Sequence, residues 1–297
     1  MRTIIPIPAF RDNYIWAVTH ERSVAVVDPG DAAPVFAWLE ANDMRLTAII
    51  ATHHHADHVG GIPALCERHD VPVLGPARET VPGRTQALGE GDHIDVPGVA
   101  LSLAVFDIPG HTAGHIALYS IDADPVLFCG DTLFAAGCGR LFEGTPAQMW
   151  SSLGKLASLS PATRVFCGHE YTLANLRFAE AVEPDNAAIR ARTAREQAKR
   201  ERDEATLPST IGAELETNPF LRAARPAVMA QAAAHAGRNI VDPVDSFAAL
   251  RAWKDGFNLR AITTRPVDAR SERAYYRRNF AAISLTTTRP NCTIDDP

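Results

Sequence analysis

The sequence predicts an α/β domain over residues 1–171, followed by an all-helical domain over residues 172–258. Short apolar runs with strand patterning alternate with helical patterns through the first part of the chain, as in proteins that layer strands and helices. Several of these strands end in a histidine or an aspartate beside a glycine. From residue 183 onward the strand patterns stop, and alanine, arginine and glutamate dominate.

The elements are predicted in order from apolar runs, periodicity and turn residues. Strands are expected at residues 13–18, 23–27, 48–51, 71–74, 99–108, 116–121, 126–129 and 164–167. Helices are expected at residues 34–42, 61–68, 148–158, 171–180, 186–205, 210–216, 227–236 and 244–255. Thr145 fits an N-cap position and Pro146 the first position of a helix. The basic residues of the 186–205 helix alternate with acids, which predicts a solvated face: Arg190, Arg192, Arg195, Lys199, Arg200 and Arg202.

A histidine-rich stretch, Thr-His-His-His-Ala-Asp-His at residues 52–58, follows the strand expected at 48–51. It therefore lies on a strand-to-helix loop, where α/β proteins commonly bind their ligands. Imidazole nitrogens and carboxylate oxygens are the donors that borderline and hard divalent metals take. A solvated, charge-rich loop is the alternative, and the density of donors disfavours it.

Spacing within this stretch suggests two ions. Side chains two residues apart near a strand end point the same way, so His53 and His55 can grip one ion while His54 faces elsewhere. Asp57 and His58 come a turn later and can grip a second ion.

Further candidate ligands follow later strands. His111, Asp131 and His169 each lie just beyond a predicted strand, and strand ends that converge on one sheet edge would form one site. A lone histidine is more often structural, but the repeated arrangement favours a shared site. Asp28 is either an ordinary turn aspartate or a support for the metal loop, and His115 either a support or a packing residue.

Composition narrows the class of protein. The chain has 297 residues, 46% of them hydrophobic, and a net charge of −6, which argues against a general nucleic-acid binder. No apolar run approaches the length of a membrane span, and residues 1–6 lack the pattern of a signal peptide. The five cysteines form no CxxC pair, which predicts a reduced, cytoplasmic setting.

Residues 259–297 differ from both predicted domains. They contain seven arginines and four acidic residues with little apolar periodicity. We expect a poorly ordered extension there.

Five further motifs complete the pattern: Arg-Asp-Asn-Tyr at 11–14, Gly-Asp-Thr-Leu-Phe at 130–134, Ala-Gly-Cys-Gly-Arg at 136–140, Cys-Gly-His-Glu-Tyr at 167–171 and Thr-Asn-Pro-Phe at 217–220. Together with the histidine-rich stretch, they make residues 1–258 resemble the metallo-β-lactamase superfamily and, within it, the glyoxalase II or hydroxyacylglutathione hydrolase family. The histidine-rich motif alone points only to the superfamily, whereas the later motifs and the helical domain point to the family.

The resemblance implies an αββα sandwich with a dinuclear metal centre, most often zinc, with iron or manganese as alternatives. It implies that His53, His55 and His111 hold the first ion. It assigns Asp57, His58 and His169 to the second ion and makes Asp131 a bridge. Asp57 and Asp131 would also take part in catalysis.

The resemblance also implies contacts to glutathione. Arg140, Phe142 and Tyr171 match such contacts from the first domain, and Arg251 and Lys254 match them from the helical domain. Position 140 is commonly lysine in the family, and arginine is not an equivalent donor. Phe142 replaces a tyrosine of some members, which keeps the ring and loses a hydrogen bond.

The implied reaction is hydrolysis of S-(2-hydroxyacyl)glutathione by a metal-bridging hydroxide. S-D-lactoylglutathione would yield glutathione and D-lactate, the second step of methylglyoxal detoxification. A thiolate leaves readily because a free thiol has a pKa of about 8.5, so no strong general acid is required. We expect a monomer that binds neither nucleic acid nor membranes.

Three other functions compete with this prediction. A persulfide dioxygenase would use one iron ion and would not need the second group of ligands. A nucleic-acid-processing metallohydrolase would require a basic cleft, and a non-catalytic metal-binding protein would leave the complete ligand set unexplained. The sequence contains no GxSxG motif, which argues against a serine hydrolase. Cys138 is more plausible as a structural or incidental thiol than as a nucleophile.

Overall fold

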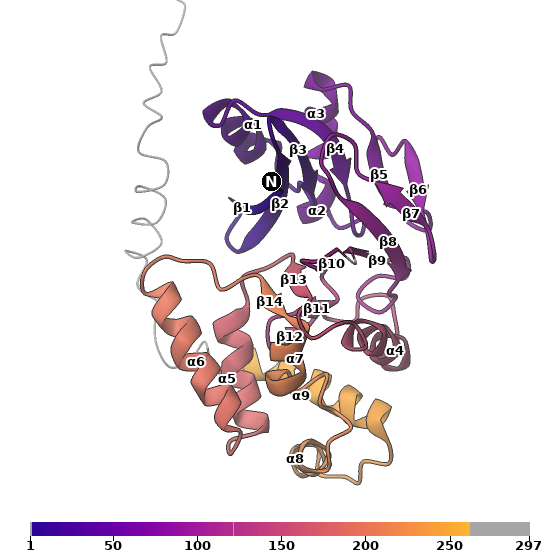
Figure 1. Cartoon of the computed structure of the whole chain (residues 1–297). Coiled ribbons are helices and arrows are strands. Elements are labelled where there is room, and N and C mark those ends of the chain that lie inside the picture. The colour runs from indigo at the N-terminus through magenta and orange to yellow at the C-terminus, as the bar shows by residue number, and fades with distance from the viewer. Residues whose placement is uncertain (1, 121, 262–297) are drawn as a thin grey trace, which may run out of the picture. The chain divides into compact units, whose positions relative to one another are not determined.

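Two six-stranded sheets form the centre of the computed structural model, which describes residues 2–120 and 122–261 (Figure 1). The first sheet has the strand order β1-β2-β3-β4-β5-β6. Its strands are β1 Thr3–Ala9, β2 Asn13–His20, β3 Ser23–Val27, β4 Arg45–Ile50, β5 Val73–Pro76 and β6 Gln86–Leu88. The pairs from β1 to β3 are antiparallel, and those from β3 to β6 are parallel.

The second sheet has the order β14-β13-β10-β9-β8-β7, and only its β10–β13 pair is parallel. Its strands are β7 His93–Asp95, β8 Ser102–Asp107, β9 Ile116–Ser120, β10 Val126–Gly130, β13 Arg164–Cys167 and β14 Ser209–Thr210. A small hairpin, β11 Leu133–Phe134 and β12 Gly137–Cys138, follows β10.

Nine helices occur within residues 2–120 and 122–261. They are α1 Ala32–Ala41, α2 Ala56–Val59, α3 Ile62–Arg68, α4 Pro146–Ala157, α5 Thr172–Val182, α6 Ala187–Arg200, α7 Ile211–Thr217, α8 Pro226–Ala236 and α9 Pro243–Ala261. Thr145 caps α4 with Pro146 at its first position, as predicted. None of these helices combines the length and the apolarity that crossing a bilayer requires.

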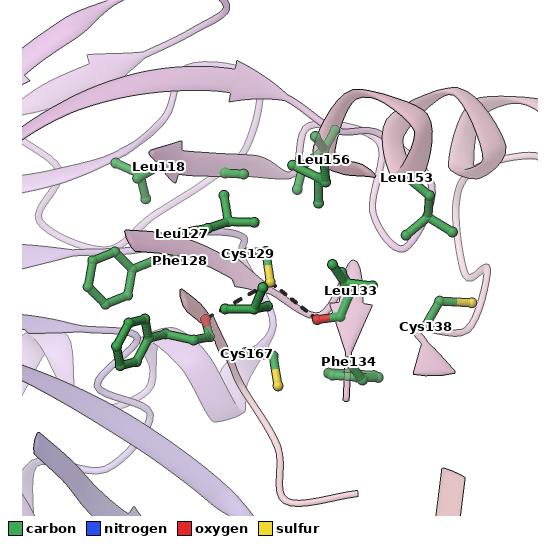
Figure 2. Close-up of a cluster of buried hydrophobic side chains, with 14 of the residues drawn as sticks. Leu118, Leu127, Phe128, Cys129, Leu133, Phe134, Cys138, Leu153, Leu156 and Cys167 are labelled. Atoms are coloured by element: carbon green, nitrogen blue, oxygen red, sulfur yellow. Dashed lines mark hydrogen bonds between the residues drawn. The ribbon is translucent and has the colours of Figure 1, made fainter. Parts of the chain in front are cut away.

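Alternation along β2 explains why the sheets stack. Tyr14 and Trp16 point into a core shared with the second sheet, whereas Ile15 and Ala17 point into a core covered by α1 and α3. Helix α4 covers the second sheet, and Figure 2 shows its Leu156 beside the strands that carry Leu118 and Leu127. The predicted αββα sandwich followed by helices is therefore confirmed.

Trp16 also ties the two sheets together. Its side chain is buried, and its Nε1 donates a hydrogen bond to the carbonyl of Cys167 at 2.9 Å. Two residues before it, the amide of Tyr14 donates to the carbonyl of Gly168 at 2.8 Å. The start of β2 is thus fixed against the end of β13, next to a predicted ligand.

Several secondary-structure predictions were wrong. Short strands β6, β7, β11, β12 and β14 were not predicted, and β14 lies beyond the point where strand patterns were expected to stop. The 186–205 helix ends at Arg200, and its Arg192 is only 3% exposed because it pairs with the buried Glu214 of α7 at 2.7 Å. The charge alternation within α6 cannot indicate that Arg192 pairs with a buried acid of another helix.

The predicted boundary between residues 171 and 172 stays a prediction. The structure groups the described residues as far as Phe257 into one compact unit. Helix α9 continues to Ala261, past its own expected end at residue 255 and past the expected end of the helical domain at residue 258. The extension predicted for residues 259–297 lies, from residue 262 on, outside the described residues.

Candidate metal centre

The histidine-rich stretch lies on the loop between β4 and α2, with Asp57 and His58 in the first turn of α2. A close backbone approach fixes this loop. A Cβ atom at Gly30 would lie 1.8 Å from the carbonyl oxygen of Asp57, so only glycine fits in the turn after β3.

The first donor group consists of His53, His55 and His111, whose ligand atoms lie within 4.8 Å of one another. Nε2 of His111 lies 3.0 Å from Nδ1 of His55. His53 is fully buried, and its Nε2 has no hydrogen-bond partner among the described residues. The structure thus brings together the three side chains predicted for one ion.

The second donor group consists of Asp57, His58 and His169, again within 4.8 Å of one another. Oδ2 of Asp57 lies 3.6 Å from Nε2 of His58 and 3.5 Å from Nε2 of His169. These are the side chains predicted for the other ion.

Asp131 lies between the two groups. Its Oδ1 is 3.4 Å from Nε2 of His58. Its Oδ2 is 3.5 Å from Nε2 of His111 and 3.2 Å from Nε2 of His169. One carboxylate therefore faces a member of the first group and two members of the second.

Hydrogen bonds outside the centre orient three of the rings. Nδ1 of His58 donates to Asp28 at 3.0 Å, and Nδ1 of His169 donates to Asp12 at 2.9 Å. Nδ1 of His111 donates to the backbone carbonyl of Arg140 at 2.9 Å. Because carboxylate and carbonyl oxygens only accept, the proton of each neutral ring lies on Nδ1, and Nε2 is the nitrogen that can present a lone pair to a metal ion in the centre.

Asp28 supports both groups. Its Oδ1 accepts from the amide of Thr52 at 2.7 Å, and its Oδ2 accepts from the Thr52 hydroxyl at 2.8 Å. That hydroxyl in turn lies 3.1 Å from Nδ1 of His53. Of the two readings of Asp28, the structure supports the one in which it holds the metal loop.

Charges within the centre shift several pKa values in opposite directions. Burial lowers the pKa of His53 and of His111. Burial also opposes protonation of His58 and His169, but Asp131 outweighs it, so the pKa of His58 rises and that of His169 rises to about 9. His58 and His169 in turn hold the pKa of Asp131 well below its usual range, against the effect of its burial.

The donor set fits a divalent cation. Three buried atoms that face the centre lack a hydrogen-bond partner among the described residues: Nε2 of His53, Nε2 of His58 and Oδ1 of Asp131. Leaving a buried polar atom unpaired costs about 1–3 kcal/mol, which a cation among these lone pairs would remove. Such a cation would also replace protons on the histidines, since metal binding and protonation compete for the same lone pairs.

Phe142 and Tyr171 line the centre. The Phe142 ring is 62% exposed and lies edge-on to His55 and His111, with centroids 5.6 and 5.2 Å away. The Tyr171 ring stacks on His169 at 4.7 Å. Burial raises the pKa of the Tyr171 phenol, so its hydroxyl stays protonated as a donor.

The other predicted substrate residues are three cations, Arg140, Arg251 and Lys254, of which the two arginines contact Asp255. Nη2 of Arg251 donates to Asp255 at 2.9 Å, and Nε of Arg140 lies 3.6 Å from the same carboxylate. Lys254 is 4% exposed and donates from Nζ to the carbonyl of Ala174 at 3.0 Å. Burial, and then Arg251, lowers the pKa of Lys254 to about 7.

Reasoning from the sequence missed several supporting residues. Asp12 lay in a motif used only for the resemblance, and Thr52 opened the histidine stretch without a role. Asn13, also in that motif, donates from Nδ2 to Oδ2 of Asp57 at 3.0 Å. The signal that could have found them is position: Asp12 and Asn13 lie at the start of β2, and Thr52 follows β4.

The fold and the site define a metal-binding hydrolase of the metallo-β-lactamase type. Residues 9–169 match the family model of the metallo-beta-lactamase superfamily, and residues 170–257 match that of the hydroxyacylglutathione hydrolase C-terminus. The chain belongs to the hydroxyacylglutathione hydrolase family of that superfamily.

Close relatives support this family assignment, and solved structures support the fold. Hydroxyacylglutathione hydrolases from Cupriavidus taiwanensis and Alkalilimnicola ehrlichii are 55% and 59% identical, over 86% of this chain and 100% and 99% of theirs. ETHE1 from Myxococcus xanthus shares the fold, with a TM-score of 0.58 and 22% identity over 87% of this chain and 91% of that one. TTHA1623, solved in a di-iron-bound form, has a TM-score of 0.52 and 27% identity over 73% and 99%.

Proposed function

We propose that this chain hydrolyses S-(2-hydroxyacyl)glutathione thioesters, with S-D-lactoylglutathione as a substrate that yields glutathione and D-lactate. This is the second step of methylglyoxal detoxification. The observation that carries the proposal is the position of Asp131, between two donor groups, beside a cationic cluster. The names of the close relatives support the same reaction.

We assign two divalent ions to the centre, zinc first, with iron or manganese as alternatives. His53, His55 and His111 would hold one ion and Asp57, His58 and His169 the other. Asp131 would serve both. When bound, such ions lower the pKa of water toward about 7 and polarise a carbonyl oxygen.

The side chains around the ions orient the reactants. The Asp57 side chain is 42% exposed, which leaves its carboxylate open to accept a hydrogen bond from the attacking water. Tyr171 stacks on His169 and carries its protonated hydroxyl at the edge of the centre. The glutathione thiolate would leave without a general acid because it is a weak base, whose conjugate acid, the thiol, has a pKa of about 8.5.

The cationic cluster would bind the carboxylates of the peptide. Arg140 and Arg251 contact one acid, Asp255, and Lys254 precedes that acid in α9, so the cluster has an excess of positive charge in a chain whose net charge is −6. The segment 138–140 joins the cluster to the centre through its backbone. The carbonyl of Cys138 accepts from Nη1 of Arg251 at 2.9 Å, and the carbonyl of Arg140 accepts from Nδ1 of His111. The peptide would then lie at the cluster and the thioester at the ions.

A cysteine nucleophile is disfavoured. Cys138 is buried, and burial raises the pKa of its thiol to about 11, so it carries little thiolate at neutral pH. We further propose that the protein is a cytoplasmic monomer, in keeping with the free thiols of the four cysteines that the structure describes and with the negative net charge of the chain.

The decisive experiment is hydrolysis of S-D-lactoylglutathione, followed through the thioester absorbance, with metal analysis on the same sample. We expect hydrolysis with two ions per chain, loss of activity on chelation and recovery when metal is restored. One iron ion per chain, with oxygen consumption on glutathione persulfide and no thioester hydrolysis, would favour the dioxygenase instead.

A further inference from the structure

His54 lies between two predicted ligands but belongs to neither donor group, and its side chain is 34% exposed. Each ring nitrogen faces a different carboxylate. Nδ1 lies 3.0 Å from Oε2 of Glu79, and Nε2 lies 3.3 Å from Oε1 of Glu143.

Both carboxylates hold the segment that follows His111. Oε1 of Glu79 accepts from the amide of Gly114 at 3.0 Å and from the hydroxyl of Thr112. Oε2 of Glu143 accepts from the amide of Ala113 at 2.8 Å. Three consecutive residues after a ligand are thus bound by the two acids that flank His54.

Glu79 is itself held firmly. It is buried, and its backbone carbonyl accepts from Nη1 of Arg84 at 2.6 Å. Burying a carboxylate is costly unless hydrogen bonds satisfy it, and Glu79 has partners on both oxygens. Because Glu79 is buried and hydrogen-bonded on both oxygens, it can fix the position of the loop that follows His111.

We propose that His54 is a positioning residue that, through Glu79 and Glu143, fixes the loop of His111 relative to His53 and His55. The consequence is selective: His54 tunes the metal affinity of the first donor group and not that of the second. This inference rests on the assignment of the two donor groups made above.

The second group is held by residues other than Glu79 and Glu143. His58 is held by Asp28, His169 by Asp12, and Asp57 by Asn13. These supports come from the start of β2 and the end of β3, whereas Glu79 and Glu143 come from later loops. Replacement of His54 should therefore alter the position of the first donor group and leave the second donor group in place.

Chelator competition with zinc tests the proposal by giving two stepwise dissociation constants per chain. We expect His54→Ala to weaken one constant by about 10- to 100-fold, as loss of an outer hydrogen-bond partner typically does, and to leave the other unchanged. His93→Ala, which changes an exposed histidine of β7, is the control and should change neither.

Conservative replacement separates positioning from general destabilisation. Glu79→Gln keeps an oxygen for Gly114 and can donate to Nδ1 of His54, so it should retain most of the affinity that Glu79→Ala loses. Equal weakening of both constants together with a lower Tm in His54→Ala would instead indicate a general structural role and overturn the proposal.

Double variants identify the affected site. In a His58→Ala background, which disables the second group, adding His54→Ala should weaken the remaining site. In a His111→Ala background it should have no further effect. An effect only in the latter background would overturn the inference, as would a third zinc equivalent that His54→Ala removes, since His54 would then be a ligand. Fewer than two equivalents on the unaltered chain would contradict the two-group assignment itself, before any variant is compared.

Discussion

Oδ2 of Asp131 lies 3.2 Å from Nε2 of His169, although 38 positions separate the two residues in the printed sequence. The parallel pairing of β10 with β13 brings them together, because its register places Gly130 opposite Cys167. Residues that follow the two strands therefore emerge at the same edge of the sheet. The register of one strand pair thus completes the centre.

Replacement of Asp131 should abolish most of the activity. Asp131→Asn keeps the shape of the side chain but removes the charge that faces both donor groups, so we expect kcat/KM to fall by about 100-fold or more. Metal content measured on the same sample should fall as well. Asp43→Asn, at an exposed surface position, should leave both unchanged. Full activity in Asp131→Asn would rule out a role in catalysis.

Substrate affinity should depend on pH through Lys254. Its pKa is lowered to about 7, so the free protein loses this positive charge as the pH rises through that value. An anionic peptide favours the charged amine, and KM for S-D-lactoylglutathione should therefore rise between about pH 7 and pH 9. Steady-state kinetics across this range will measure it. Lys254→Met should have a higher KM at pH 6 and a flatter profile, and an unchanged profile would refute the assigned contact.

A buried acid should contribute strongly to stability. Glu214 is fully buried and accepts from Nη2 of Arg192 at 2.7 Å, from the amide of Ala136 at 2.7 Å and from Asn218 at 3.0 Å. Glu214→Ala leaves a buried arginine unpaired, so we expect a loss of about 3–5 kcal/mol in the free energy of unfolding. Denaturant titration will measure it.

The matched control is Glu216→Ala, because Glu216 is an exposed residue of the same helix. It should change the free energy of unfolding by no more than about 0.5 kcal/mol. Similar losses in the two variants would contradict the importance assigned to the buried pair.

Steric crowding at Gly168 should make it irreplaceable. A Cβ atom there would lie 2.6 Å from Oδ1 of Asp131 and 2.6 Å from Cε1 of His58. Gly168→Ala should therefore displace these side chains and reduce the zinc stoichiometry, which metal analysis will detect. Gly154→Ala is the control, since a Cβ there meets nothing within 4 Å and should stabilise α4 by up to about 1 kcal/mol. If Gly168→Ala still bound two zinc ions, Asp131 and His58 would be able to move enough to accommodate the methyl group, and the prediction would be wrong.

Local spacing explains how much of the centre could be predicted. The candidate ligands of residues 53–58 lie between the end of β4 and the first turn of α2, so their spacing in the sequence was enough to predict them. His111, Asp131 and His169 were found because each follows a strand beside a glycine. The link from His54 to Glu79 crosses between loops, and no local pattern indicates it.

The helical part was harder to predict for a related reason. Arg192 has the charge alternation of a solvated face, and its burial depends on Glu214 in another helix. Strand β14 has two residues, too few for a periodic signal, and exists because Ser209 and Thr210 pair with β13. Both features depend on contacts between distant segments, which composition and periodicity do not contain.

Strand β14 has a practical consequence for dissecting this chain. It covers the outer edge of β13, the strand that leads to His169. A fragment cut at residue 171 would leave that edge open to pair with other molecules, which invites aggregation. The catalytic half is therefore a poor candidate for transplantation or fusion by itself, and attempts at a minimal enzyme should retain the chain at least through Thr210.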